Sequence, residues 1–94
     1  MTDEEILKDR EEKYGSPDVF FKTYGDMCRI LDFYALKKDP SGEEISEGHL
    51  SAMKMVLLKV LRSVWNPEVE DNYCDARNYI SIAEMIAKKG LNNK

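Results

Sequence analysis

Apolar side chains recur every three or four residues over three long segments of this chain, and this helical periodicity is the feature that most restricts its fold. The first segment, residues 17–38, has an apolar face about two rows wide, whereas the second, residues 47–64, is apolar on almost all sides. A helix of the second kind is typical of the centre of a bundle. The main apolar positions of the three segments are Phe20, Tyr24, Met27, Leu31 and Tyr34; Leu50, Met53, Val56, Leu57, Val60, Leu61 and Val64; and Val69, Tyr73, Ala76, Ile80 and Ala83.

Capping residues mark where these helices begin. Thr2 followed by Glu5 forms a capping box, which predicts a short helix over residues 3–14. Ser16-Pro17 and Asn66-Pro67 each place a capping residue before a Pro, and the second pair predicts a last helix over residues 67–89, ended by Gly90. Ser46 is the predicted N-cap of the central helix.

Three long helices and one short helix, joined by tight loops, predict an all-α antiparallel bundle in a single domain over residues 1–94. A core built from 94 residues is small, so burial against a further copy would help, and we expect a homo-oligomer. Gly25 inside the first long helix costs about 1 kcal/mol relative to Ala, which predicts a close helix approach there.

Charge and composition restrict the partners. With 18 acidic and 14 basic side chains the formal net charge is −4, and a nucleic-acid-binding face would need a basic excess that is absent. The acidic N-terminus and the short apolar run at residues 55–58 predict neither a signal peptide nor a membrane span. Cys28 and Cys74 form no CxxC pair, so we expect reduced thiols and a cytoplasmic protein.

The last predicted helix carries a polar stripe. Asp71, Asp75 and Asn78 are spaced i, i+4 and i+7, so they lie along one side of it. Two carboxylates one turn apart can share Mg²⁺, which prefers oxygen ligands. The alternative is a solvated row, because acidic residues are also common near helix N-termini.

Two cations stand on the otherwise apolar central helix. Lys59 and Arg62 are three residues apart and share a face, so they need acidic partners or a phosphate. They either bind a ligand or form a salt-bridge network with the acids of the last helix. Separately, residues 43–47 spell EExxE and residues 68–71 spell ExxD, the form used by MazG-like nucleotide pyrophosphatases to hold Mg²⁺.

These motifs occur in an order that resembles a group of short phage and prophage proteins. The resemblance covers about residues 10–88 and rests on Tyr14-Gly15-x-Pro17, on Met55-Val56-Leu57-Leu58-Lys59-x-x-Arg62, on Asn66-Pro67-Glu68-x-x-Asp71 and on Asp75-x-x-x-Tyr79. That group is distantly similar to nucleotide-modification-associated domains and to all-α MazG-like pyrophosphatases. The resemblance therefore implies an oligomeric helical bundle whose ligand lies in a cleft against the last helix.

By position, the resemblance marks Lys59, Arg62, Asn66, Asp71, Asp75 and Tyr79. Asn78 of the polar stripe, where the group has Gly, and Tyr14, as a stacking lid, complete the ligand-binding residues that we expect: Lys59, Arg62, Asn66, Asp75, Asn78, Tyr79 and Tyr14. Val69 and Leu50 stand where the group has a His and an acidic residue. If those two residues belong to a catalytic set, the resemblance implies that this protein binds its ligand without turnover. We therefore expect a phage-type accessory protein that binds an anionic nucleotide in a cleft between the last two helices, with or without Mg²⁺-dependent hydrolysis. The alternative is a non-enzymatic module that contacts or inhibits a host protein, or a sponge that sequesters a nucleotide signal.

Overall fold

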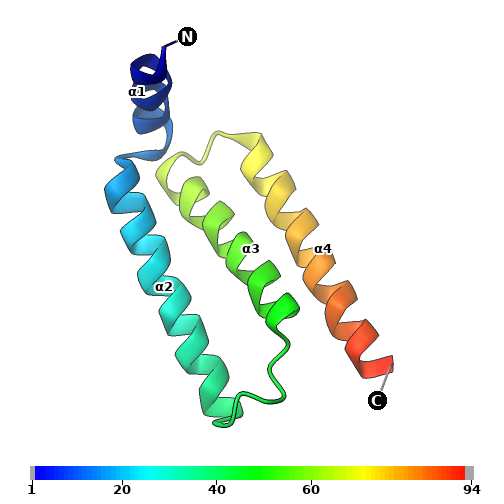
Figure 1. Ribbon diagram of the computed structural model, residues 1–94. Helices are drawn as coiled ribbons and strands as arrows, with labels where there is room; N and C mark the ends of the chain where they lie inside the picture. The colour runs from blue at the N-terminus through cyan, green and yellow to red at the C-terminus, as the bar shows by residue number, and fades with distance from the viewer. Residues whose placement is uncertain (1, 93–94) are drawn as a thin grey trace.

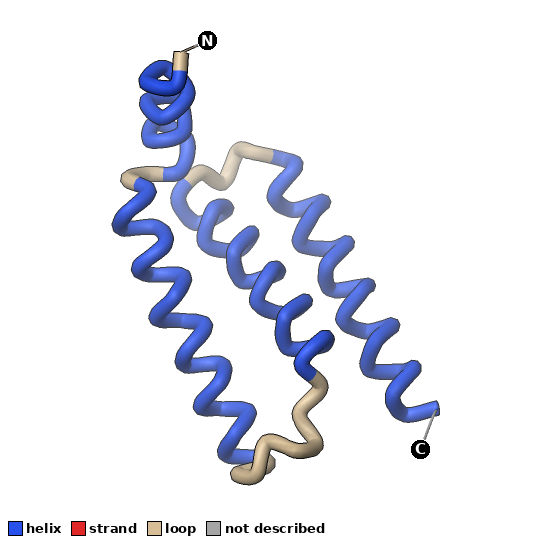
Figure 2. Tube along the Cα trace, viewed as in Figure 1, coloured by secondary structure: helices blue, strands red, loops and turns tan. Residues whose placement is uncertain are grey.

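Four α-helices form the molecule, and no strand occurs in residues 2–92, the part that this computed structural model describes; the side chains of residues 11, 13, 14, 91 and 92 lie outside that description. The helices are α1 (Asp3–Tyr14), α2 (Pro17–Lys38), α3 (Glu47–Trp65) and α4 (Glu70–Asn92). In Figures 1 and 2, α3 lies between α2 and α4, and α1 projects beyond one end of the bundle. The predicted all-α bundle is confirmed.

The first two helices begin at the predicted residues, but their caps differ. The Thr2 hydroxyl oxygen accepts a hydrogen bond from the Glu5 backbone N–H at 3.2 Å, as a capping box requires. Ser16 is at the N-cap position of α2, yet its side chain makes no capping hydrogen bond, and Pro17 begins the helix. Local sequence therefore places the start of α2 through the fixed φ of Pro rather than through the serine hydroxyl.

The loop between α2 and α3 is organised by one carboxylate. Asp39 accepts hydrogen bonds from the Ser41 hydroxyl at 2.7 Å, the Ser41 N–H at 3.2 Å and the Glu44 N–H at 2.7 Å. Ser46 then accepts from the His49 N–H at 3.3 Å, which confirms it as the N-cap of α3.

The bounds of α4 differ from the predicted 67–89. Residues 66–69 form a turn in which the Asn66 side-chain oxygen accepts from the Glu68 N–H at 3.3 Å, so the helix begins at Glu70. Gly90 was expected to end α4, but the helix continues through it to Asn92.

Packing is close between α3 and α4 and sparse elsewhere. Ala52 of α3 and Ala83 of α4 are 6% and 2% exposed, and Asn72 of α4 is 3% exposed. No described residue of α2 is buried. The predicted close approach at Gly25 is wrong, because a Cβ added there would meet nothing within 4 Å.

The bundle is elongated for its length. Its extents are 50 × 24 × 22 Å and its radius of gyration is 16.0 Å. A compact domain of this size has a radius of gyration of about 12 Å. Among the described residues, no helix is both long enough and apolar enough to cross a membrane.

Candidate functional site

One predicted pair of charges is formed between α3 and α4. The Lys59 ammonium lies 3.0 Å from a carboxylate oxygen of Asp75. The Lys59 side chain is 12% exposed and that of Asp75 is 44% exposed. The cation is therefore neutralised and largely shut away, whereas part of the carboxylate is open to solvent. This contact is the ion pair that the salt-bridge interpretation of the sequence requires, and the open carboxylate is what the ligand interpretation requires.

Asp71 and Asn78 lie one turn to either side of Asp75 on α4, and both are exposed. In the described residues, no group of three or more His, Cys, Asp or Glu side chains comes close enough to hold a metal ion. A cation bound at Asp71 and Asp75 would therefore need further oxygen ligands from phosphates or water, as Mg²⁺ commonly has. The EExxE and ExxD segments form no such group either.

Arg62 belongs to a different site from Lys59. Its guanidinium carbon lies over the Phe20 ring of α2, 5.7 Å from the ring centroid, which is a cation–π geometry. Phe20 in turn meets Phe21 edge to face, with centroids 5.3 Å apart. The spacing of Lys59 and Arg62 predicts that they share one face of the helix, but the Lys59 side chain reaches α4 and the Arg62 side chain reaches α2.

Arg62 and both phenylalanines line a cavity of about 170 Å³ where α1, α2 and the end of α3 meet, which we call the arginine cavity. Its other lining residues are Leu7, Arg10, Gly15 and Pro17. Two guanidinium groups and two aromatic rings thus border one hollow. Such a lining suits a ligand that has an anionic group beside a flat ring.

Gly15 makes this corner possible. Its φ of 81° is in the left-handed region, which a side chain rarely adopts. The backbone also passes under the Trp65 ring, so that a Cβ at residue 15 would lie 2.9 Å from Cζ2 of the indole. The Trp65 side chain is 60% exposed and covers Gly15.

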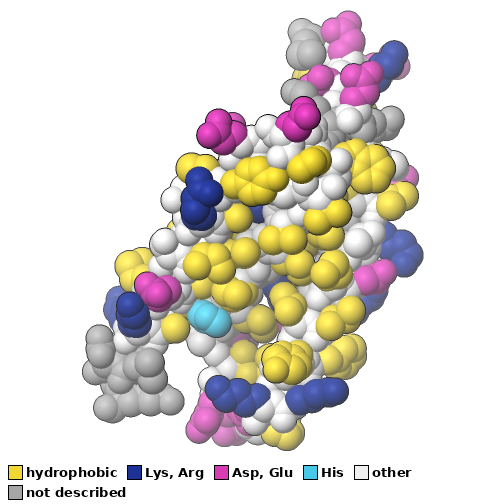
Figure 3. Space-filling model, turned by 180° about the vertical axis from the view of Figure 1, so that it is seen from behind, with side chains coloured by type: hydrophobic (Ala, Val, Ile, Leu, Met, Phe, Trp, Pro, Cys, Tyr) yellow, Lys and Arg dark blue, Asp and Glu magenta, His cyan; other side chains and the backbone are white. Residues whose placement is uncertain are grey.

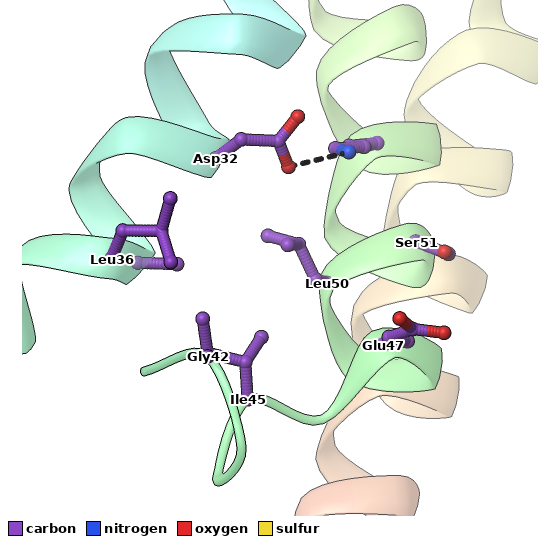
Figure 4. Close-up of a pocket in the computed structure, with 9 residues that line it drawn as sticks. Asp32, Leu36, Gly42, Ile45, Glu47, Leu50 and Ser51 are labelled. Atoms are coloured by element: carbon purple, nitrogen blue, oxygen red, sulfur yellow. Dashed lines mark hydrogen bonds and ion pairs between the residues drawn. The ribbon is translucent and has the colours of Figure 1, made fainter. Parts of the chain in front are cut away.

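A larger cavity, about 370 Å³, lies between the end of α2, the following loop and the start of α3. Figure 4 shows Leu36 and Leu50 facing one another across it, beside the ion pair of Asp32 and Lys54 at 2.8 Å. Sequence reasoning missed Lys54, although the argument used for Lys59 applies equally to it: a cation on a mostly apolar helix needs a partner. Glu47 adds a second acid to the lining, so this cavity is poorly suited to an anion.

Comparison with known proteins places the chain in one family. The model of the Domain of unknown function DUF6378 matches residues 1–87. The chain belongs to the DUF6378 family. No curated protein and no solved structure matches it. The matched range of this DUF6378 chain holds both cavities and the Lys59–Asp75 pair, and the family description names no activity, so the phage-type and MazG-like resemblance stays a prediction.

Three predicted ligand-binding residues of the DUF6378 chain remain to be placed: Asn66, Tyr79 and Tyr14. Asn66 is used by the corner before α4: its N–H donates to the Arg62 carbonyl at 2.9 Å and its side chain caps the turn. Tyr79 is half-buried on α4. Tyr14 ends α1, but its side chain lies outside the described residues, so its expected role as a lid remains a prediction.

Hydrogen bonds lower the pKa of two carboxylates that line neither cavity. The Ser41 hydroxyl, followed by the Glu44 N–H, lowers the pKa of Asp39 below its ordinary 3.8. Lys22 and then Arg29 lower the pKa of Asp26 in the same way. On α2, burial and then the neighbouring Cys28 thiol raise the pKa of Tyr24 above 10.0. All three groups are on α2 or in the loop after it and line neither cavity.

Proposed function

We propose that this protein binds an anionic small molecule with a flat aromatic group, of which a nucleotide is the best-fitting class, and that the arginine cavity holds it. The observation that carries the proposal is the convergence of Arg10, Arg62, Phe20 and Phe21 on one hollow. Guanidinium groups form charge-assisted hydrogen bonds with phosphate, and aromatic rings offer a face or an edge to a base.

This location is favoured over a cleft centred on Lys59. The Lys59 side chain is only 12% exposed, so its ammonium is largely shut away from a phosphate. The arginine cavity, at about 170 Å³, is smaller than the roughly 300–1,000 Å³ of pockets that enclose a whole ligand. It would therefore hold one end of a nucleotide, with the rest extending over the surface. Asp71 and Asp75 remain the residues that would bind Mg²⁺ if hydrolysis takes place.

Thermal melting with chosen ligands tests the proposal. A nucleoside triphosphate at ten times its Kd stabilises the folded state by about 1.4 kcal/mol, or roughly 6–11 °C for a domain of this size. Inorganic triphosphate and the free nucleoside should each give a smaller shift. Arg62→Gln and Arg10→Gln each remove a charge-assisted contact and should weaken binding about 10- to 100-fold.

Arg77→Gln is the matched control, because it makes the same charge change at an exposed position of α4 outside both cavities. Equal weakening by Arg77→Gln, or no shift with any nucleotide, with or without Mg²⁺, contradicts the proposal. Chromatography of the incubated nucleotide then separates hydrolysis, which releases product, from sequestration, which returns the ligand intact.

The second candidate is a non-enzymatic module that contacts a host protein. It is favoured by Val19 and Phe33 of α2, which are 63% and 65% exposed. Capture of one defined host protein should then be lost with Phe33→Ser and kept with Asp75→Ala. Capture that survives Phe33→Ser counts against this candidate.

A further inference from the structure

The apolar face of α2 is not covered within the chain. Helices of globular proteins bury such a stripe against a neighbour. Here, however, no described residue of the 22-residue helix α2 is buried, and Ile30 and Tyr34 are 64% and 74% exposed.

The central helix α3 also has a side that no other helix covers. Lys54 points to α2 through Asp32, and Lys59 points to α4 through Asp75. At about 100° per residue, Val60 lies about 100° from Lys59 and about 120° from Lys54, so it faces neither neighbour. Val60 and Val64, one turn apart, are accordingly 45% and 76% exposed.

The two flanking helices also carry apolar residues that α3 does not cover. On α4, Tyr73 and Ile80 are 40% and 45% exposed and lie about 160° and 140° around the helix from Asp75, which reaches α3. On α2, Ile30 and Tyr34 each lie about 160° around the helix from Asp32, which also reaches α3. Figure 3, which shows the molecule from behind, shows apolar side chains spread over all three helices. We call the six residues the open face: Ile30, Tyr34, Val60, Val64, Tyr73 and Ile80.

The solvent-exposed area of the chain is larger than that of a typical folded monomer of its mass. A folded monomer of 10.9 kDa exposes about 5,600 Å². This chain exposes 7388 Å². The excess is roughly 1,800 Å² per chain. Part of it comes from the exposed helix α1, and the whole is comparable to the roughly 1,000–2,500 Å² that each partner buries in an obligate homodimer.

We propose that the open face is the interface of a homodimer, in which a second copy of this chain packs the same six residues against the first. In the described residues the only buried apolar side chains are those of Ala52 and Ala83. A single chain therefore has no core of large side chains, and burial against a partner would supply one. A second copy can do this, because a two-fold axis brings one apolar face against its equal.

Charges at the margin of α2 do not oppose this pairing. The carboxylate of Asp26 forms ion pairs with Lys22 and Arg29 of its own chain. The dimer would then join helices of both copies around one shared core, as helical bundles do. This inference is independent of the proposed ligand, because Arg10 and Arg62 are not part of the open face.

Sedimentation equilibrium of the full chain tests the proposal. We expect a particle of twice the 10.9 kDa chain mass and a melting temperature that rises with protein concentration. Val64→Glu buries an unpaired charge in the interface and should weaken association about 100-fold or more. Met85→Glu is the matched control, because Met85 is 62% exposed and lies about 140° around α4 from Ile80.

Two results overturn the proposal. One is a folded monomer whose melting temperature is the same at all concentrations. The other is a dimer that survives Val64→Glu or that dissociates with Met85→Glu instead. If Val64→Glu does not fold, the near-isosteric Val64→Thr replaces it: weaker association with helical content retained supports the interface, and unchanged association contradicts it.

Discussion

Replacing Gly15 by Ala tests the corner on which the arginine cavity depends. The φ of Gly15 is 81°, and an L side chain in the left-handed region costs about 1–2 kcal/mol. The added Cβ would also lie 2.9, 3.0 and 3.1 Å from three carbons of the Trp65 indole, well inside the roughly 3.5–4.0 Å of ordinary carbon contact. Relieving that overlap by moving the ring or α1 costs about 1–2 kcal/mol more.

The expected total loss in the free energy of unfolding is therefore about 2–4 kcal/mol, a large share of the 5–15 kcal/mol that a domain has. It corresponds to a melting temperature lower by roughly 8–32 °C. Urea denaturation followed by helical circular dichroism, at one fixed protein concentration, measures the loss. Because Gly15 lines the cavity, nucleotide binding by Gly15→Ala should weaken as well.

Gly25→Ala is the matched control. Gly25 is within α2 and a Cβ there meets nothing within 4 Å, so Ala should raise the stability by about 0.5–1 kcal/mol. In a Trp65→Ala background the steric part disappears, and Gly15→Ala should cost only the 1–2 kcal/mol, approximately, of the left-handed backbone. Equal losses in both backgrounds would refute the indole contact, and no loss in either would refute the positive φ.

Three further changes test local contacts of the fold. Ser46→Ala should lower stability by about 1 kcal/mol because it removes the N-cap of α3, whereas Ser16→Ala should change little because its side chain makes no capping bond; thermal melting of both variants decides. Hydrogen bonds lower the pKa of Asp39, so its carboxylate stabilises the folded state above pH about 3.8, and this stabilisation is lost as the pH falls through the lower folded pKa. Denaturation from pH 6 to pH 2 should therefore show a weaker pH dependence of stability in Asp39→Asn than in the parent chain. Tyr73→Phe removes a 2.6 Å hydrogen bond to the Pro67 carbonyl in the turn before α4 and should cost about 0.5–1.5 kcal/mol in urea denaturation; an unchanged free energy of unfolding would contradict this role of the hydroxyl.

The helices could be predicted from sequence because their signals are local. Capping residues and apolar spacing act within one or two turns, and α1, α2 and α3 begin at the expected residues. The start of α4 was missed because a Pro after Asn66 suits the first position of a helix and the second position of a β-turn equally well. The turn prevails here because the Asn66 side chain bonds to the Glu68 N–H.

The site was predictable only in part, because it depends on how helices are rotated against one another. Spacing placed Asp71, Asp75 and Asn78 on one side of α4, but it does not reveal that Lys59 would reach that side while Arg62 turned to α2. The arginine cavity has no periodic signal. It exists because the turn at the left-handed Gly15 places α1 beside the start of α2 and the end of α3, and such long-range placement is not encoded in any single segment.

The pattern of α3 carries one requirement that the single chain leaves unmet. A helix that is apolar on almost all sides is most stable with neighbours in every direction, because burying apolar surface stabilises the fold by roughly 25 cal/mol per Å² and exposed surface gains nothing. Within the chain, α2 and α4 cover two directions and leave Val60 and Val64 uncovered. Val60 and Val64 stay exposed although α1 lies near their end of α3 (Figure 1), so no described segment of the chain covers them. Covering Val60 and Val64 is what the proposed homodimer would add, so the concentration dependence of the melting temperature tests this requirement of α3 directly.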